Sequence, residues 1–366
     1  MVYDREWRGA LTPQLDSAMP LPPLIGHERV KTRLAGAHAS GKLPQALLLA
    51  GPRGVGKQRL ALWLAQLIHC EAPGHEPCGQ CRPCRLVLSL QHPDVHWFVP
   101  VELSKRGGTG VGDADKQVDL VADALAEEMA ARREQPLYGS PAGLASHPVA
   151  SVRLLLRRLA LTPAMGKRKV FIVGDAERLI PQLGTEVAAN ALLKALEEPP
   201  ADSVIIITAA DPNALLPTIM SRIVLVRVAR IADSDVTAFA QQALGIGNKA
   251  ELAQRVTAAE GCIGKLFATA PSRSGQPADD QADRFLEAPW LFALGQVPFQ
   301  ARGGFTDMLD ALANRLRSEA KRGVDTEKLV EAIALVLDAR DLAQGNVNPQ
   351  LLAAVLAEDL QETRRS

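Results

Sequence analysis

The sequence predicts an α/β fold: a mostly parallel sheet covered by helices, followed by a C-terminal part that is entirely helical. Apolar strand-like runs alternate with helical patterns up to about residue 228, and the strand signal disappears beyond it. A glycine-rich phosphate-loop motif joins the first predicted strand to a helix. The length of 366 residues predicts two or three domains.

Five apolar runs are predicted to be strands: residues 46–50, 95–101, 170–173, 204–208 and 223–228. Helical patterns cover residues 30–40, 57–69, 149–161 and 185–197. Residues 185–197 have the clearest period, because Ala188, Leu192 and Leu196 fall on one apolar stripe. Strands that alternate with helices in this way predict parallel pairing.

Two segments depart from the alternation. Residues 1–24 hold several prolines and no period, which predicts a tail. Residues 102–148 are predicted to be an insertion with one amphipathic helix, on which Val118, Val121 and Leu125 have helical spacing. Two interpretations of that helix stay open: it packs on its own domain, or it binds a partner.

The C-terminal part divides into helical units. Residues 229–270 are predicted to be a small helical domain, and residues 271–283 a linker, because that stretch is rich in Ser, Pro and Asp. Residues 284–366 are predicted to be a second helical domain, with Leu309 and Leu312 in its first apolar stripe.

Composition narrows the class of protein. The 41 Lys and Arg residues balance 41 Asp and Glu residues, which disfavours a freestanding nucleic-acid binder. No apolar run is as long as a membrane helix and the N-terminus does not resemble a secretory signal, so we expect a cytoplasmic protein without a membrane partner. The 5 cysteines are then expected to be thiols or metal ligands.

The motif at residues 51–57, G-P-R-G-V-G-K, is typical of a loop whose backbone N–H groups surround phosphate oxygens. Its lysine would reach the outer phosphates. The candidate nucleotide-binding residues are Gly51, Arg53, Gly54, Val55, Gly56, Lys57, Gln58 and Asp175.

Compared with other phosphate loops, this loop lacks residues that usually hold Mg²⁺ and orient the attacking water. Gln58 stands where such loops carry the Ser or Thr that holds Mg²⁺. Asp175 follows the strand predicted at 170–173 and is the candidate for the Mg²⁺ shell, a helix or turn cap being the alternative. Glu177 is displaced by one residue from the position of a base that orients water. We therefore expect ATP as a ligand and little hydrolysis.

The spacing C-x7-C-x2-C-x2-C predicts a tetrahedral zinc site in a module at residues 70–84. Its ligands would be Cys70, Cys78, Cys81 and Cys84. Four thiolates close the site, so the zinc would be structural; an iron–sulfur cluster and unliganded thiols are the alternatives. His69 and His75 are interpreted as surface residues, and Cys262 as a buried, apolar side chain.

Further motifs follow in a specific order: the cysteine cluster after the first helix, His-Pro-Asp at 92–94, NALLKALEEPP at 190–200 and Ser-Arg at 221–222. With the run at 26–57, this order resembles the clamp-loader subunits of bacterial DNA polymerase III, which are AAA+ proteins. The resemblance spans roughly residues 24–270. It implies an AAA+ domain over residues 25–228, a helical lid over 229–270 and a helical collar over 284–366.

The resemblance covers an ATPase motor branch (gamma/tau) and a delta-prime branch. Motor chains have Thr, Glu and Arg at the positions where this chain has Gln58, Ala176 and Gly264. Motor chains also carry a hydroxyl side chain near the position of Ala209 or Ala210, which neither alanine provides. These differences favour the delta-prime branch: a component of a DNA-directed DNA polymerase (nucleotidyltransferase) holoenzyme that is itself an impaired or inactive ATPase. An active motor subunit is the alternative.

In the family, the arginine of Ser-Arg reaches the ATP site of the neighbouring subunit. The resemblance therefore implies that Arg222 is an arginine finger acting in trans; a surface arginine paired with a local carboxylate is the alternative. Glu197 and Glu198 lie at a predicted helix C-terminus, where the dipole disfavours anions. Their position suggests a nearby cationic partner or a solvated helix end.

The implied partners are the gamma/tau and delta subunits, the sliding clamp and, through the complex, primed DNA. A local basic cluster supplies the candidates for DNA phosphate contact. They are Arg153, Arg157, Lys167 and Arg168, with a solvated helix face as the alternative.

Overall fold

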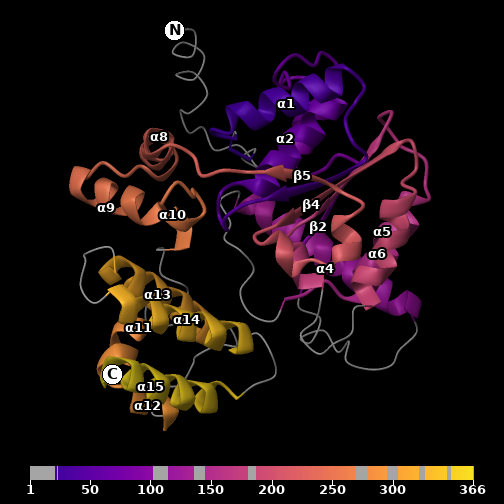
Figure 1. Ribbon diagram of the computed structural model, residues 1–366. Helices are drawn as coiled ribbons and strands as arrows, with labels where there is room; N and C mark the ends of the chain where they lie inside the picture. The colour runs from indigo at the N-terminus through magenta and orange to yellow at the C-terminus, as the bar shows by residue number, and fades with distance from the viewer. Residues whose placement is uncertain are drawn as a thin grey trace.

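The structure is a computed structural model that describes residues 21–22, 24–101, 114–135, 145–179, 187–268, 278–294, 304–320, 326–343 and 348–365. Most of the predicted tail at residues 1–24 lies outside these ranges. Figure 1 shows a sheet flanked by helices, with two further groups of helices beside it. Each of the three parts contains its own cluster of buried apolar side chains.

Five parallel strands form the sheet in the order β2-β3-β4-β1-β5. They are β1 (Ala46–Ala50), β2 (Val95–Phe98), β3 (Lys169–Val173), β4 (Ser203–Ala209) and β5 (Val224–Arg227). The inner strands β1, β3 and β4 are buried along their whole length, which explains their continuous apolar sequences. The predicted parallel-sheet α/β class is confirmed.

The second strand is shorter than its apolar run. Residues 95–101 predict a single strand, but β2 ends at Phe98, and Val101 pairs antiparallel with Ser146. Pro100 lies between these two pairings. Proline has no N–H to donate, so it cannot continue the ladder of β2.

The helices of this part are α1 (Glu28–Ala39), α2 (Lys57–His69), α3 (Arg82–Leu88), α4 (Ala114–Glu134), α5 (Val149–Leu159), α6 (Val187–Glu197) and α7 (Pro217–Met220). Two 3₁₀ turns are η3 (Ala176–Leu179) and η4 (Pro212–Ala214). Helix α2 contacts β1, β3 and β4 and is buried on nearly every side. Because α2 starts at Lys57, this packing fixes the end of the phosphate loop.

Helix α4 belongs to the predicted insertion at residues 102–148. Val118, Val121 and Leu125 are buried in the same core as the sheet, and α4 packs along α5. Of the two interpretations, packing on its own domain is the one that the structure shows. The flanking residues 102–113 and 136–144 lie outside the described ranges.

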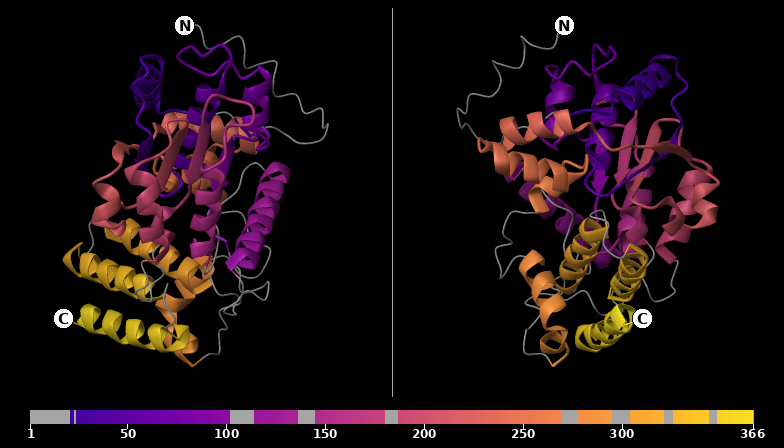
Figure 2. Two further views of the ribbon diagram at one scale, coloured as in Figure 1. Left: turned by 90° about the vertical axis from the view of Figure 1, so that its right-hand side faces the viewer. Right: turned by 60° about the vertical axis from the view of Figure 1, so that its left-hand side comes forward.

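The first helical group after β5 consists of α8 (Asp233–Leu244), α9 (Lys249–Ala259) and α10 (Lys265–Ala268), packed around Val236 and Phe239. The second consists of α11 (Ala278–Glu287), α12 (Pro289–Ala293), α13 (Gly304–Ala320), α14 (Thr326–Ala343) and α15 (Pro349–Arg365). Figure 2 shows this second group at the end of the molecule opposite α1. None of the described helices is both long and apolar enough to cross a bilayer.

The second helical group differs from the prediction at its start. Helix α11 begins at Ala278, so the end of the segment 271–283, predicted as a linker, is helical. Ala282 and Phe285, three residues apart, are both buried in the C-terminal core, and this contact favours helix there. Leu309 and Leu312 are buried in the same core, as their stripe predicts.

Candidate functional site

The phosphate loop at residues 51–57 follows the carboxyl end of β1 and runs into α2. Gly54 and Gly56 have φ angles of 75° and 104°, which favour glycine, and Gly56 is the N-cap of α2. Since the strands are parallel, the ends of β3 and β4 lie at the same edge of the sheet. This edge combines a glycine-rich loop with the N-terminus of α2, an arrangement suited to an anion.

Lys57 is buried and its ammonium group is held by its own loop. Nζ donates hydrogen bonds to the carbonyl oxygens of Gly51 at 2.8 Å and Pro52 at 2.9 Å. Burial lowers the pKa of Lys57, and the charges of Asp175 and Glu177 partly oppose that shift. A phosphate that binds to Lys57 would take the place of these two carbonyl contacts.

Gln58 packs against the end of β3. A Cβ at Gly174 would lie 2.9 Å from Cδ of Gln58, so the amide of Gln58 packs directly on the backbone of Gly174. Oε1 of Gln58 is buried and has no hydrogen-bond partner among the described residues. Asp175 comes next, with a φ of 51°, and its N–H donates to Oγ1 of Thr208 at 3.1 Å. Position 58 thus brings an amide, not a hydroxyl, to the place where Mg²⁺ would need a ligand.

Glu177 lies in the same cluster. Its Oε1 accepts a hydrogen bond from the N–H of Ala210 at 3.3 Å, and Nη2 of Arg53 is 4.0 Å away. Burial and, after it, the charge of Asp175 raise the pKa of Glu177. The carboxylate is therefore held between the end of β4 and the phosphate loop.

Two segments that are distant in sequence cover the loop. Gly264 donates its N–H to the carbonyl of Gly54 at 2.8 Å, and a Cβ at Gly264 would lie 2.6 Å from Cα of Gly54. On another side, Nε2 of His27 lies 2.9 Å from the carbonyl oxygen of Val55. The helical group α8–α10 is thus tied directly to the phosphate loop through position 264.

His147 supports the strand end beside Asp175. It is fully enclosed, and its Nε2 lies 2.7 Å from the carbonyl oxygen of Gly174. Burial lowers the pKa of His147 to about 4. The neutral ring therefore donates to Gly174 and fixes the backbone from which Asp175 extends.

The depressed pKa of His147 predicts a loss of stability in acid. The unfolded chain, with a histidine pKa near 6.5, takes up the proton first, so the contribution is present above pH 6.5 and lost as pH falls toward 4. It amounts to up to about 3 kcal/mol. Urea unfolding at pH 7 and pH 4.5 should show a smaller pH-dependent loss in His147→Gln than in wild type; equal losses would contradict this role.

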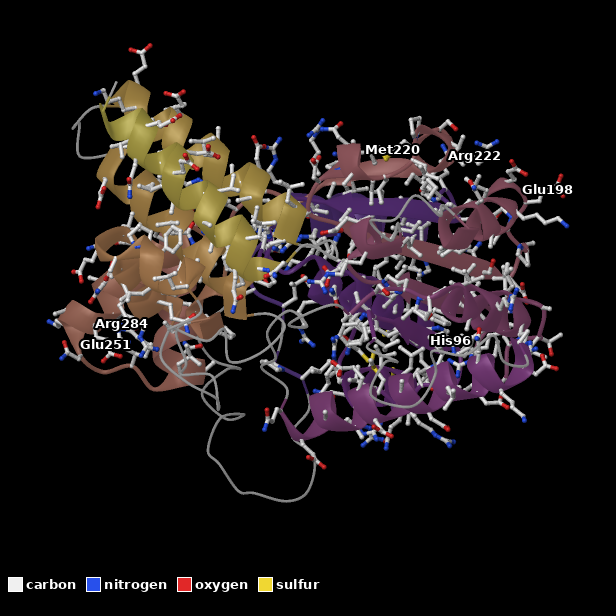
Figure 3. All side chains as sticks on the ribbon, turned by 90° about the horizontal axis from the view of Figure 1, so that it is seen from below. His96, Glu198, Met220, Arg222, Glu251 and Arg284 are labelled. Atoms are coloured by element: carbon white, nitrogen blue, oxygen red, sulfur yellow. The ribbon has the colours of Figure 1, made fainter. Side chains whose placement is uncertain are left out.

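Arg222, at the end of α7, is paired within its own chain. Its Nε and Nη2 lie 2.9 Å and 2.7 Å from Oε1 of Glu197, and Nη1 donates to the carbonyl of Thr218 at 2.7 Å. Figure 3 shows Arg222 near Glu198 at the border of the sheet domain. The cation expected beside Glu197 is therefore Arg222 itself, partly exposed and oriented by these bonds.

The basic candidates lie on two segments. Arg153 and Arg157 are exposed on α5, whereas Lys167 and Arg168 lie in the turn before β3, Lys167 exposed and Arg168 half-buried. Arg157 forms an ion pair with Asp115 of α4. The insertion helix therefore engages one of the four predicted cations.

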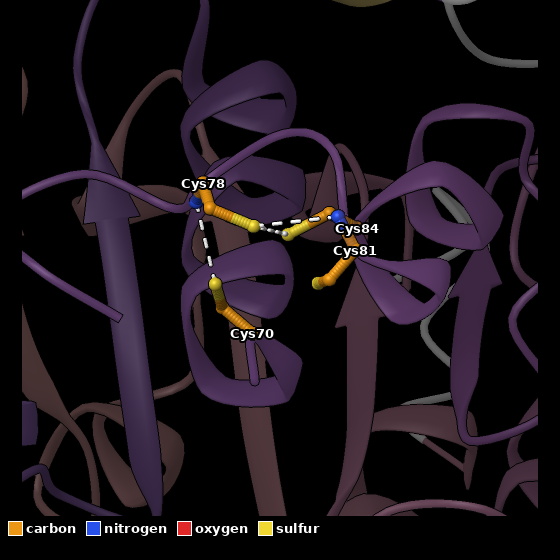
Figure 4. A group of neighbouring side chains, drawn as sticks. All are labelled: Cys70, Cys78, Cys81 and Cys84. Carbon is orange, nitrogen blue, oxygen red and sulfur yellow. Dashed lines mark hydrogen bonds between the residues drawn. The ribbon is translucent and has the colours of Figure 1, made fainter. Parts of the chain in front are cut away.

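The four clustered cysteines converge, as Figure 4 shows. Their Sγ atoms all lie within 4.8 Å of one another. The N–H of Cys78 donates to Sγ of Cys70 at 3.3 Å, and the N–H of Cys81 to Sγ of Cys78 at 3.4 Å. Zn–S bonds of about 2.3 Å would place the sulfurs of a tetrahedral site about 3.8 Å apart. The group therefore fits one metal ion.

The thiol of Cys78 loses its proton more readily than an ordinary cysteine thiol. Backbone hydrogen bonds from Cys81 and Gln80 lower its pKa to about 6. A thiolate is the form that binds metal. Cys262 is fully buried outside this group, as predicted.

The interpretation of His69 as a surface residue is wrong. His75 is exposed, but His69 is buried, and its ring lies 4.0 Å from that of His92 between centroids. The reason is that α2 is enclosed on nearly all sides up to its last residue. A helix with this burial leaves no exposed position for His69.

A parallel sheet with a phosphate loop at the carboxyl ends of its strands defines a P-loop protein. A family model described as "DNA polymerase III, delta subunit" matches residues 26–232. The chain therefore belongs to the DNA polymerase III delta subunit family. Within it, the chain is delta-prime-like, because several of its relatives have that name.

Two of these relatives are called DNA polymerase III subunit delta'. The protein of Bacillus subtilis strain 168 is 32% identical over 194 residues, 53% of this chain and 45% of that protein. The protein of Haemophilus influenzae is 36% identical over 177 residues, 48% of this chain and 40% of that protein. The chain thus spans less than half the length of these curated relatives.

Among solved structures, a DNA polymerase III gamma subunit-related protein from Thermotoga maritima aligns with a TM-score of 0.43 and 19% identity. The alignment covers 90% of this chain and 99% of that one.

Proposed function

We propose that this chain is a delta-prime-type subunit of a clamp loader, the assembly that uses ATP to load a sliding clamp onto primed DNA. In this proposal residues 25–228 are an AAA+ domain, 229–270 its lid and 284–366 a collar, with 271–283 as the connection. Membership of the DNA polymerase III delta subunit family supports the role. So do the relatives named delta'.

One observation carries the assignment within that family: the phosphate loop keeps its glycines and Lys57, while the side chain at position 58 is an amide packed on Gly174. Loop N–H groups and Lys57 suit phosphate oxygens, and ATP, when bound, would supply them. The residues fit Mg²⁺ poorly, since Gln58 brings no hydroxyl and Ala176 follows Asp175. We therefore assign nucleotide binding with little or no hydrolysis.

The rate-enhancing group would be Arg222, supplied to the ATP site of a neighbouring subunit. A guanidinium is planar, permanently charged and able to donate two parallel hydrogen bonds to a phosphoryl group. Its contacts with Glu197 and Thr218 would orient it before assembly. On assembly the guanidinium would exchange the Glu197 carboxylate for the γ-phosphate.

The remaining assignments follow from the same role. The metal at Cys70, Cys78, Cys81 and Cys84 would be zinc, because four thiolates suit a closed structural site. Partners would be the gamma/tau and delta subunits and the sliding clamp, with primed DNA met by Arg153, Arg157, Lys167 or Arg168. The protein would work in the cytoplasm, where bacterial DNA is replicated.

Lys57→Ala tests the nucleotide site of the isolated chain. We expect wild type to bind ATP with no appreciable turnover and the variant to bind at least about tenfold more weakly, because it loses a charged hydrogen bond to phosphate. Titration calorimetry and steady-state hydrolysis measure the two quantities. Lys249→Ala, at an exposed lysine that begins α9, is the control and should bind ATP as wild type does.

The same experiment tests the alternative function, in which this chain is an active motor subunit that hydrolyses ATP itself. Substantial ATP turnover by the isolated chain, abolished by Lys57→Ala, would favour the motor over the proposal. Gln58 and Ala176 argue against that outcome.

A further inference from the structure

A cavity of about 260 Å³ lies between α4 and the edge strand β2, away from the residues of the phosphate loop and the cysteine cluster. Leu62, Val87, Val95, Leu125 and Met129 are among its apolar walls. These residues come from α2, α3, β2 and α4, so the cavity forms where the insertion helix covers the domain. Figure 3 shows His96, another lining residue, beside α4.

The polar side chains that line this cavity are basic. They are Arg133 and Arg158 with His92 and His96, and no carboxylate lines it in the part of the chain that the structure describes. Burial lowers the pKa of His96 to about 4 and lowers that of His92. The positive charge of the cavity at neutral pH therefore comes from the two arginines.

Among the described residues, the guanidinium of Arg158 and one ring nitrogen of His92 have no hydrogen-bond partner. Arg158 is half-buried, burial lowers its pKa, and its guanidinium carbon lies 5.9 Å from the centroid of the Phe98 ring. Nε2 of His92, a buried side chain, has no hydrogen-bond partner among the described residues. The acid Asp115 pairs with Arg157, which points elsewhere on α5. A half-buried cation without an anion costs free energy, which a bound anion would offset.

We propose that this cavity binds a small organic anion: a one- or two-ring apolar body that carries a phosphate or carboxylate. Arg158 and Arg133 hold the anionic group, and the apolar walls from α2, α3, β2 and α4 hold the rings. The volume is slightly below the ~300 Å³ at which pockets for drug-sized ligands begin, which limits the body to that size. The proposal is independent of the clamp-loader role.

Three probes separate the parts of this ligand: 1-naphthyl phosphate, 1-naphthol and inorganic phosphate, each titrated into the full chain by calorimetry. We expect 1-naphthyl phosphate to bind and the two fragments to bind at least about tenfold more weakly, since each lacks half of the contacts. Arg158→Gln should weaken the binding of 1-naphthyl phosphate by about tenfold or more. Arg153→Gln, on the same helix but outside the cavity, should have no effect.

Two further measurements keep the test decisive. The melting temperature of Arg158→Gln should equal or exceed that of wild type, because an unpaired, half-buried charge is removed. Lys57→Ala should bind 1-naphthyl phosphate as wild type does. Absence of saturable binding, equal binding by Arg158→Gln, or loss of binding in Lys57→Ala, which would move the probe to the phosphate loop, would each overturn the proposal.

Discussion

Replacing Cys84 with Ser should release the zinc that we propose for the cysteine cluster and destabilise the sheet domain by more than about 3 kcal/mol. Cys84 is fully buried on α3, and its sulfur lies against that of Cys78 at 4.0 Å. Binding of a structural metal contributes directly to the free energy of folding. The change should appear as a lower melting temperature, with elemental analysis falling from about one zinc per chain to near zero.

Cys262→Ala is the matched control, because Cys262 is an equally buried thiol in the same core but outside the cluster. It should keep its zinc. A strong chelator added to wild type should reproduce the melting temperature of Cys84→Ser. A wild-type protein that is free of metal and melts at the same temperature as Cys84→Ser would contradict the zinc assignment.

Arg222→Ala should lower ATP hydrolysis at the neighbouring site that it serves by about 10³-fold or more, when the chain is assembled with its partner subunits, clamp and primed DNA. The reason is that a guanidinium stabilises the charge that develops on the γ-phosphoryl group. Steady-state hydrolysis by the complex, stimulated by clamp and DNA, is the measurement. Assembly itself should persist, since the side chain is partly exposed.

Two variants control for charge and for folding. Arg230→Ala removes another exposed arginine that is paired with a carboxylate, Glu260, and should leave turnover unchanged. Glu197→Gln removes the intramolecular partner of Arg222 but keeps the guanidinium, so it should retain turnover. Loss of activity in Arg230→Ala equal to that in Arg222→Ala would indicate a general effect of charge.

The sequence was informative wherever a property depends on neighbouring residues. The phosphate loop, the cysteine spacing and the buried strands each follow from a short local pattern, so β1, α2 and the convergence of the four cysteines could be predicted. The same holds for α4, whose apolar stripe predicts the face that packs on the core.

Contacts between distant segments had no local signal. The tie between Gly54 and Gly264 joins residues far apart in sequence, and no sequence pattern pointed to it. The pairing of Arg222 with Glu197 and the burial of His69 depend in the same way on how helices pack. The basic cavity beside α4 arises from several elements at once and has no motif.

The central claim is that this chain supplies Arg222 to the ATP site of a neighbouring subunit. ATP hydrolysis by the complex would not depend on the chain's own phosphate loop. The most direct measurement compares Lys57→Ala with Arg222→Ala in the assembled complex by clamp- and DNA-stimulated ATP hydrolysis. We predict that Lys57→Ala retains most of the turnover of the wild-type complex and that Arg222→Ala loses the activity of the site it serves. The reverse pattern, with activity lost in Lys57→Ala and kept in Arg222→Ala, would contradict the claim.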